Sequence, residues 1–460
     1  MQTHAISQSK VSRQLHLPII EDNIPHVPQI KKSKFSDTTV VSNKTLPIHR
    51  WVPWIAGFSS SFVKEALREY SHGGIVLDPF SGVGTTLVDS ICKDCHAIGF
   101  EINPYAALAC RVKTSFAKID VSELAKTITD AGEFYEQKVH SSYTPQSMPP
   151  EGFKTRHTFY SDAVLRKVLI IQDFIALIQD EIIRDVFRLA FASNMVKFSN
   201  YSYEPSLSTR ASAGREDIHD FPVGQSIIEK LTEMLSDIRL VNKKTGNLHA
   251  QARIINDTFF NYENYVQSES VELIITSPPY LNNYHYNRNT RPHLYWLDLA
   301  HSPNDFKKLE QKNVGKYWQT VREKANIELE FSLRHSDIEE KIRILQNLNP
   351  EKGIYGGKGW ANYAATYFND CYKFAKGIQF SLKKGGIALV VIGNSILQGM
   401  MIQTDQYFGQ IAESIGLELL DIEIPRKERV GNSIIQSDVR VEKAKKADKL
   451  YEAIVKLKKV

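Results

Sequence analysis

Short apolar runs that each stop at a polar or acidic side chain recur along this sequence. The run Ile75–Leu77 stops at Asp78, and apolar residues at helical spacing follow it. Such runs are typical of strands buried on both faces of a sheet, and their alternation with helices favours parallel strands. The pattern therefore predicts a doubly wound α/β sheet. Its strands are expected within residues 75–78, 97–101, 252–257, 271–276, 387–392, 417–424 and 450–457.

Two segments interrupt this alternation. Helical periodicity dominates residues 119 to about 250 and the charged stretch 304–349, while 361–382 is predicted as a helix that belongs to the sheet and 353–359 as a loop. Residues 1–47 have no persistent period, which favours a solvated tail over an extended arm wrapped on the body. The predicted organisation is an N-terminal arm (1–47), a sheet domain (48–118, 252–300 and 361–460), a helical insert (119–251) and a helical and loop insert (301–360).

The stretch DPFSGVGTT, residues 78–86, forms the turn between the first predicted strand and its helix. Glycines 82 and 84 allow the backbone to come close to a ligand. A Walker loop would need a lysine and four residues between its glycines, and a dinucleotide fingerprint would need a third glycine at position 87, which is leucine. The loop is therefore predicted to hold a nucleoside without a pyrophosphate.

Two further acids follow predicted strands. Glu101 lies about 20 residues beyond Asp78, the spacing at which a carboxylate in such folds accepts hydrogen bonds from ribose hydroxyls. Asp257 follows the third predicted strand, where its carboxylate could receive the amino group of an adenine ring.

The strand at 271–276 runs directly into Ser277-Pro278-Pro279-Tyr280. The two prolines have no N–H donors and a fixed φ, so the loop is stiff and its carbonyls can accept hydrogen bonds. Tyr280 can lie flat against a ring, and Ser277 adds a hydroxyl acceptor. These properties suit a planar group that carries an exocyclic amine.

Aromatic, amide and basic residues are interleaved at 197–215 and again at 280–296. Such mixtures suit phosphates and unstacked bases, although a surface loop without a ligand is nearly as consistent with the first segment. The formal net charge of +5, from 57 Lys and Arg against 52 Asp and Glu, allows a polyanionic partner without requiring one. The candidate nucleic-acid contacts are Asn200, Tyr201, Arg210, Arg215, Tyr284, Arg288 and Arg291.

Other function classes are disfavoured by composition. A hydrophobic content of 42% and a charged content of 24% are ordinary for a globular protein. Cys92 and Cys95 have CxxC spacing, but no second pair completes a zinc site, so we expect no metal and reduced thiols. The N-terminus has no signal-peptide pattern and the longest apolar run, 387–392, is too short to cross a bilayer, so a cytoplasmic location is expected.

Taken together, DPFxGxGTT and TSPPY resemble the S-adenosylmethionine-dependent DNA amino-methyltransferases, which methylate exocyclic nitrogens of cytosine or adenine. The resemblance covers roughly residues 48–118, 252–296 and 361–460. It implies a Rossmann-like, mostly parallel sheet with an antiparallel final strand, S-adenosylmethionine as cofactor and double-stranded DNA as partner, and it allows a cognate restriction endonuclease acting on the same site. The implied cofactor-binding residues are Phe58, Asp78, Pro79, Phe80, Gly82, Gly84, Thr85, Thr86, Glu101, Ile102, Asn103, Asp257 and Thr276; the implied catalytic residues are Ser277, Pro278, Pro279 and Tyr280.

The serine in the second motif resembles the N4-cytosine subgroup. The resemblance implies that Ser277 and the carbonyl of Pro278 accept the hydrogens of the target amine, while Tyr280 stacks on the flipped base. No proline precedes a cysteine here, which argues against C5-cytosine chemistry. The cofactor loop comes first in this chain, whereas a permuted order is common in that subgroup. An N6-adenine DNA methyltransferase, an RNA or protein N-methyltransferase and a silent DNA-binding subunit stay open, and recognition is expected in 119–250 together with 281–360.

Overall fold

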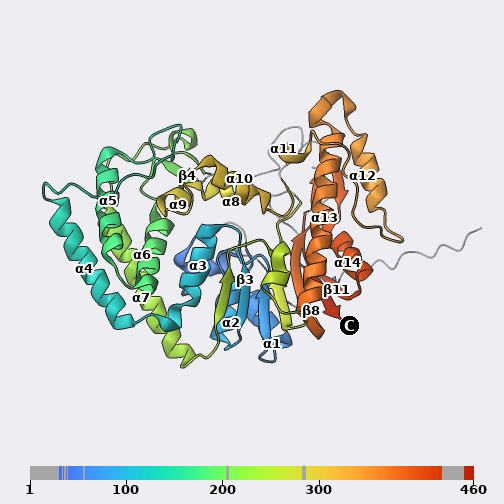
Figure 1. The fold of residues 1–460 in the computed structure, drawn as a ribbon, viewed down its shortest axis with the longest axis horizontal. Helices are drawn as coiled ribbons and strands as arrows, with labels where there is room; N and C mark the ends of the chain where they lie inside the picture. Colours follow the sequence, from blue (N-terminus) through green and yellow to red (C-terminus); the bar gives the residue numbers. More distant parts are fainter. Residues whose placement is uncertain are drawn as a thin grey trace, which may run out of the picture.

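The computed structural model describes residues 31–33, 35, 38, 40–54, 57–203, 207–281, 286–316, 318–426 and 450–460. Its strands are β1 (Lys31–Lys32), β2 (Ile75–Asp78), β3 (Ala97–Phe100), β4 (Tyr201–Tyr203), β5 (Leu207–Thr209), β6 (Ala252–Ile255), β7 (Val271–Thr276), β8 (Leu382–Gly393), β9 (Ser395–Leu397), β10 (Met400–Ile402), β11 (Leu417–Arg426) and β12 (Glu452–Lys459). Eight of them form one sheet in the order β1-β11-β12-β8-β7-β2-β3-β6 (Figure 1).

The strand directions confirm the predicted fold class. Strands β6, β3, β2, β7 and β8 run parallel to one another, and β12 lies antiparallel between β8 and β11. All seven strands expected from the sequence are present. The carboxyl ends of β2, β3, β6 and β7 therefore meet at one edge of the sheet, where ligands bind in open α/β folds.

Helices cover both faces of the sheet and form a lobe beside it, seen on the left of Figure 1. The α-helices are α1 (Ser60–Tyr70), α2 (Thr85–Cys92), α3 (Pro104–Thr114), α4 (Val121–Val139), α5 (Asp162–Leu177), α6 (Glu181–Asn194), α7 (Val223–Thr245), α8 (Tyr286–Asn289), α9 (Arg291–Trp296), α10 (Pro303–Gln311), α11 (Trp318–Val321), α12 (Ile338–Gln346), α13 (Gly357–Ser381) and α14 (Thr404–Ser414). Short 3-10 turns are η1 (Val40–Lys44), η2 (His49–Trp51), η3 (Phe116–Lys118), η4 (Ala211–Ala213), η5 (Phe259–Asn264) and η6 (Pro350–Tyr355).

Alternate residues of the central strands bury on opposite faces, as expected for a sheet covered on both sides. Val76 and Leu273 pack against α1, in the cluster that contains Phe62. Leu77 and Ile274 pack instead with residues of α13 and α14. This two-sided burial explains why 75–77 and 273–275 read as continuous apolar runs in the sequence.

The helices α4 to α7 form the predicted helical insert. The lobe is fastened to the sheet domain by Asp237 of α7, which is 1% exposed. Its carboxylate accepts hydrogen bonds from the backbone N–H of Ile48 (2.9 Å), from the guanidinium of Arg50 (2.6 and 3.0 Å) and from Nε1 of Trp51 (3.0 Å). One buried carboxylate therefore joins α7 to the segment that precedes α1.

The described residues between 31 and 47 contact the body, so for this part the preferred interpretation as a solvated tail is wrong. Strand β1 pairs with β11, placing Lys31 opposite Glu423. Asn43 receives a hydrogen bond from the N–H of Ser60 (2.9 Å) and donates one to the carbonyl of Phe58 (3.1 Å). Backbone pairing and buried polar contacts have no period in the sequence, which is why the pattern did not reveal them.

Other differences concern the inserts. Residues 201–203 and 207–209 form the hairpin β4–β5 inside the insert expected to be helical. The loop expected at 353–359 is the 3-10 turn η6 followed at once by α13, and the segment expected to be helical at 304–349 is interrupted between α11 and α12. Within the described residues, no helix is long and apolar enough to span a membrane.

Candidate active site

The turn after β2 brings backbone close to the end of the sheet. Gly82 and Gly84 adopt positive φ angles of 50° and 84°, which residues with a Cβ rarely adopt. A Cβ on Gly84 would lie 3.2 Å from Sγ of Cys110, and one on Gly82 would lie 3.3 Å from Nε1 of Trp54. The positive φ angles favour glycine at both positions, and a Cβ at either would also press on its neighbour. The predicted loop of residues 78–86 therefore forms a tight cradle ahead of α2.

Two side chains of helix α3 donate hydrogen bonds to carbonyls of this loop. The thiol of Cys110 donates to the carbonyl of Gly82 (3.1 Å), and Nζ of Lys113 donates to the carbonyl of Val83 (2.8 Å). Lys113 is 1% exposed, and burial lowers the pKa of its ammonium to about 8. A lysine in such a place is costly, so its bond to the loop indicates a role in fixing the loop carbonyls.

Asp78 lies at the end of β2 with 1% of its surface exposed. Its Oδ1 accepts from Oγ1 of Thr276 (2.6 Å), at the end of the neighbouring strand β7, and from the N–H of Phe80 (3.1 Å). Burial raises the pKa of Asp78 to about 6, and these hydrogen bonds oppose the rise only in part. The Asp78–Thr276 bond also ties the cofactor loop to the TSPPY segment, which the sequence predicted as two separate motifs.

A second carboxylate follows β3. Glu101 accepts from the N–H of Asn103 (2.7 Å), and burial raises its pKa to about 7, with the nearby charge of Asp78 adding to the rise. Asn103 itself caps α3 and donates to Oγ1 of Thr290 (2.7 Å). Two carboxylates with raised pKa values at one edge of a sheet favour a ligand that brings positive charge or hydroxyl donors.

This arrangement fits S-adenosylmethionine. Its sulfonium and amino groups are cationic and its ribose carries two hydroxyl donors, which match the acids Asp78 and Glu101. The glycine cradle offers backbone without a basic side chain for a phosphate. Asp78 and the loop would hold the methionine half, and Glu101 would hold the ribose.

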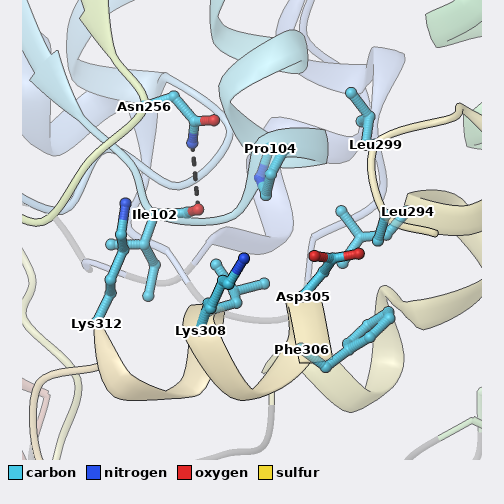
Figure 2. A pocket seen from close by; sticks show the side chains of 11 residues that line it. Ile102, Pro104, Asn256, Leu294, Leu299, Asp305, Phe306, Lys308 and Lys312 are labelled. Carbon is cyan, nitrogen blue, oxygen red and sulfur yellow. Dashed lines mark hydrogen bonds between the residues drawn. The ribbon is translucent and has the colours of Figure 1, made fainter. Parts of the chain in front are cut away.

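A cavity opens beside Glu101, between α10 and the ends of β3 and β6. Ile102 and Asn256 line it just after β3 and β6, Pro104 lines it at the start of α3, and Lys308 and Lys312 point into it from α10 and its end (Figure 2). Asn256 donates to the carbonyl of Ile102 (3.1 Å), which fixes one wall.

Asp257, predicted to meet the adenine, lies beside this cavity. Its carboxylate accepts from Nζ of Lys312 (2.8 Å) and from Nδ2 of Asn261 (2.8 Å). Burial opposes ionisation, but these two donors outweigh it and lower the pKa of Asp257. The carboxylate is therefore ionised and already engaged by α10, an element the sequence did not connect with the cofactor.

The TSPPY segment leaves β7 beside the cradle. The hydroxyl of Tyr367 donates to the carbonyl of Pro279 (3.0 Å), which fixes the loop on α13. Ser277 Oγ lies 3.5 Å from the hydroxyl of Tyr280, and that hydroxyl donates to Oε1 of Glu452 on β12 (3.2 Å).

Phe58 and Phe80 occupy different environments. The ring of Phe58 is buried against Phe62 in the core beneath α1, with centroids 5.7 Å apart, so only its backbone approaches the loop, through Asn43. Phe80 is partly exposed and meets Phe374 edge to face at 5.1 Å. Pro79, Thr85 and Thr86 lie within the cradle itself, where Thr86 donates to the carbonyl of Ile275 (3.3 Å).

The two segments expected to bind nucleic acid lie side by side. The hydroxyl of Tyr203 donates to the carbonyl of Asn289 (3.1 Å), and the N–H of Leu207 donates to the side chain of Asn289 (3.0 Å). Hairpin β4–β5 is thereby joined to α8, although some 80 residues separate them in the sequence. Arg288 is exposed at this junction.

Not every predicted contact residue faces outward. Asn200 is buried and bridges the carbonyl of Thr158 (3.1 Å) and the N–H of Ile218 (2.7 Å), and the hydroxyl of Tyr201 donates to the carbonyl of His157 (3.3 Å).

The other three arginines predicted as nucleic-acid contacts are more exposed to solvent than Asn200 and Tyr201. Arg215 is exposed, Arg210 donates to the carbonyl of Glu216 (2.7 Å), and Arg291 stacks on Phe153 and Tyr295 while bonding the carbonyl of Lys154 (3.0 Å). Tyr284 lies outside the described residues. Among the described residues, no group of three or more His, Cys, Asp or Glu side chains could hold a metal ion.

Lys113, Lys312 and Glu452 were missed by sequence reasoning. Lys113 sits three residues after Cys110 on one face of α3, a spacing too common to be a signal. Glu452 lies on the last strand and reaches Tyr280 only because β12 inserts beside β8. Their partners are set by topology and have no local motif.

Comparison with known proteins gives relatives of one kind. Type II methyltransferase M.BsoBI of Geobacillus stearothermophilus is 24% identical over 465 residues, covering 93% of this chain and 90% of that protein. Type II methyltransferase M.AvaI of Nostoc sp. (strain PCC 7120) is 24% identical over 412 residues, covering 82% of this chain and 80% of that protein. No family model matches the chain.

A solved structure, the rRNA methyltransferase aviRa of Streptomyces viridochromogenes, has a TM-score of 0.29 at 8% identity, with 88% of this chain and 87% of that chain covered. This similarity is too low to carry an argument. The evidence for a methyltransferase comes from the sequence relatives, from the sheet topology and from the acids Asp78 and Glu101. Together they support a methyltransferase whose methyl donor is S-adenosylmethionine.

Proposed function

We propose that this chain is a DNA methyltransferase of a restriction-modification system that methylates the exocyclic N4 of a cytosine flipped out of duplex DNA. The observation that supports the proposal is the bond between Thr276 and Asp78, because it joins the residue before Ser277 to the loop of residues 78–86. The type II relatives support DNA as the substrate, and a cognate endonuclease is the partner expected for such an enzyme.

The residues of the TSPPY loop address the main chemical difficulty. An exocyclic amine is a poor nucleophile because its lone pair is delocalised into the ring. Ser277 Oγ and the carbonyl of Pro278 accept its two hydrogens, which favours a pyramidal nitrogen with a directed lone pair. When bound, S-adenosylmethionine supplies an electrophilic methyl group, and the loop contributes by holding the amine in line with it.

The remaining groups bind and orient. Tyr280 stacks on the flipped base, with its loop fixed by the bond from Tyr367 to Pro279. Extrusion of the base costs a few kcal/mol, which contacts to the DNA backbone must offset. The joined surface of hairpin β4–β5 and α8 supports such contacts, with Arg215 and Arg288 exposed there, while Asn200 and Tyr201 brace the hairpin from within.

The test is to incubate the protein with methyl-labelled cofactor and mixed-sequence duplex DNA and to identify the modified nucleoside. N4-methylcytosine is the expected product. N6-methyladenine would replace the cytosine assignment with the adenine alternative, since a serine hydroxyl can accept from either amine. Labelling of RNA or protein in place of DNA would refute the substrate class. Cofactor binding with no transfer to any of these would identify a silent subunit.

A further inference from the structure

The hydroxyl groups of Ser277 and Tyr280 in the TSPPY loop form a chain of hydrogen bonds that leads to the carboxylate of Glu452 on β12. Tyr280 donates to Oε1 of Glu452 (3.2 Å), and Ser277 Oγ lies 3.5 Å from the Tyr280 hydroxyl. Thr38 of the N-terminal arm donates to the other oxygen, Oε2, at 3.0 Å. Three segments distant in sequence therefore meet at one side chain beside the candidate active site.

The direction of these hydrogen bonds follows from the acceptor. A carboxylate has no proton to give, so it must accept from both Thr38 and Tyr280. With its proton committed to Glu452, the Tyr280 oxygen is left as an acceptor for the hydroxyl of Ser277. The separation of 3.5 Å is long, as is common for catalytic hydrogen bonds before substrate binds.

We propose that Glu452 is a positioning residue that sets the direction of the Ser277 hydroxyl through Tyr280. The inference rests on the proposed function, because it matters only if Ser277 accepts a hydrogen from the target amine. A serine whose proton points toward Tyr280 presents its lone pairs to the amine. Without Glu452 the phenol loses this acceptor and can donate to Ser277, whose own proton then turns toward the amine and opposes it.

Thr38 holds Glu452 in place for this task. It is 1% exposed, and other described residues of the arm also contact the body, Lys31 and Lys32 through β1 and Asn43 through the bond from Ser60. Thr38 of the N-terminal arm thus reaches the catalytic loop through one carboxylate, which gives this residue a function beyond covering the sheet edge.

The test compares Glu452→Ala, Tyr280→Phe and the double variant in methyl transfer to duplex DNA at saturating cofactor. Each single change should lower kcat about tenfold to a hundredfold, the range for losing a hydrogen bond to a charged group, with KM for DNA changed less. Because both changes break one chain of bonds, the double variant should be no slower than the worse single variant. Glu452→Gln keeps an acceptor oxygen and should recover kcat to within about threefold of wild type.

Two measurements separate positioning from damage to the fold. Glu418→Ala, on β11 beside β12, removes an exposed carboxylate 3.8 Å from Lys458 and should leave kcat unchanged. Cofactor affinity and melting temperature should match between wild type and Glu452→Ala. If these two readings hold but the losses of the two single variants multiply, or if only KM rises, Glu452 has no such role. If the wild type itself transfers no methyl group to DNA, the proposed function and this role fall together.

Discussion

Replacing Asp78 by asparagine should raise the stability of the cofactor-free protein and weaken the binding of the cofactor. Asp78 is 1% exposed, and its Oδ1 accepts from Thr276 and from the N–H of Phe80. Asparagine has the same shape and keeps an oxygen for both donors. The substitution therefore removes the negative charge with little change in packing.

The magnitude follows from the pKa of the buried acid. Burial raises the pKa of Asp78 from 3.8 to about 6. Since the pKa is higher in the folded state, Asp78 contributes stability that is full below pH 3.8 and is lost as the pH rises through about 6. At roughly 1.4 kcal/mol per pKa unit, the loss is on the order of 3 kcal/mol. At pH 8 the wild type has lost this contribution, and the asparagine variant has not.

Thermal unfolding without cofactor measures the difference. An unfolding entropy of roughly 2.1 cal/mol/K per residue gives a chain of this length about 1 kcal/mol/K. Asp78→Asn should therefore melt about 3 °C above wild type at pH 8, and the gap should close as the pH falls to about 4. Asp130→Asn, on the exposed face of α4, controls for the loss of one negative charge.

Cofactor affinity should move in the opposite direction. Asp78→Asn should bind labelled S-adenosylmethionine at least about tenfold more weakly, a loss of about 1.4 kcal/mol. Two results would contradict the burial argument. One is a variant that melts below wild type at pH 8, and the other is a difference in melting temperature that stays the same at every pH. Unchanged affinity would mean that Asp78 has no part in holding the cofactor.

Three further substitutions test other parts of the molecule. Ser277→Ala should lower kcat about a hundredfold while cofactor affinity stays within twofold, because it removes an acceptor needed only at the reacting amine; equal losses in both would place Ser277 in the cofactor site instead. Lys113→Met should weaken cofactor binding about fivefold to tenfold, since the carbonyl of Val83 loses its donor and the cradle loosens; titration with labelled cofactor checks this, and unchanged affinity would refute it. Asp237→Ala should destabilise the chain by about 3 kcal/mol, read from urea unfolding, because Arg50 and Trp51 lose their shared acceptor; a change below about 1 kcal/mol would mean that the lobe is fastened by apolar packing alone.

The sheet could be predicted because its strands carry their own signal. Each central strand is buried on both faces, so burial appears in the sequence as an apolar run, which is unbroken at 387–392. The cradle could be predicted because Gly82 and Gly84 are fixed by local backbone geometry. These features depend on neighbours in sequence, and the sequence displays them directly.

The contacts that complete the site depend on neighbours in space. Glu452 reaches Tyr280 because β12 lies antiparallel beside β8, and Lys312 reaches Asp257 because α10 folds over the ends of β3 and β6. Nothing local distinguishes these residues from other charged surface positions. For the same reason Asn200 reads as a nucleic-acid contact in the sequence, yet its amide bridges two backbone groups of its own lobe.

The bonds of Asp237 that hold the helical lobe to the sheet domain bear on the spacing of bases in the DNA target. Because one buried carboxylate holds α7 to residues 48–51, we expect the helical lobe to move with the sheet domain as one body. The span between the hairpin surface and the catalytic pocket is then fixed when the chain folds. For the proposed substrate, the DNA must then adapt to this fixed distance. The enzyme should therefore accept only one number of base pairs between the bases that are read and the base that is methylated.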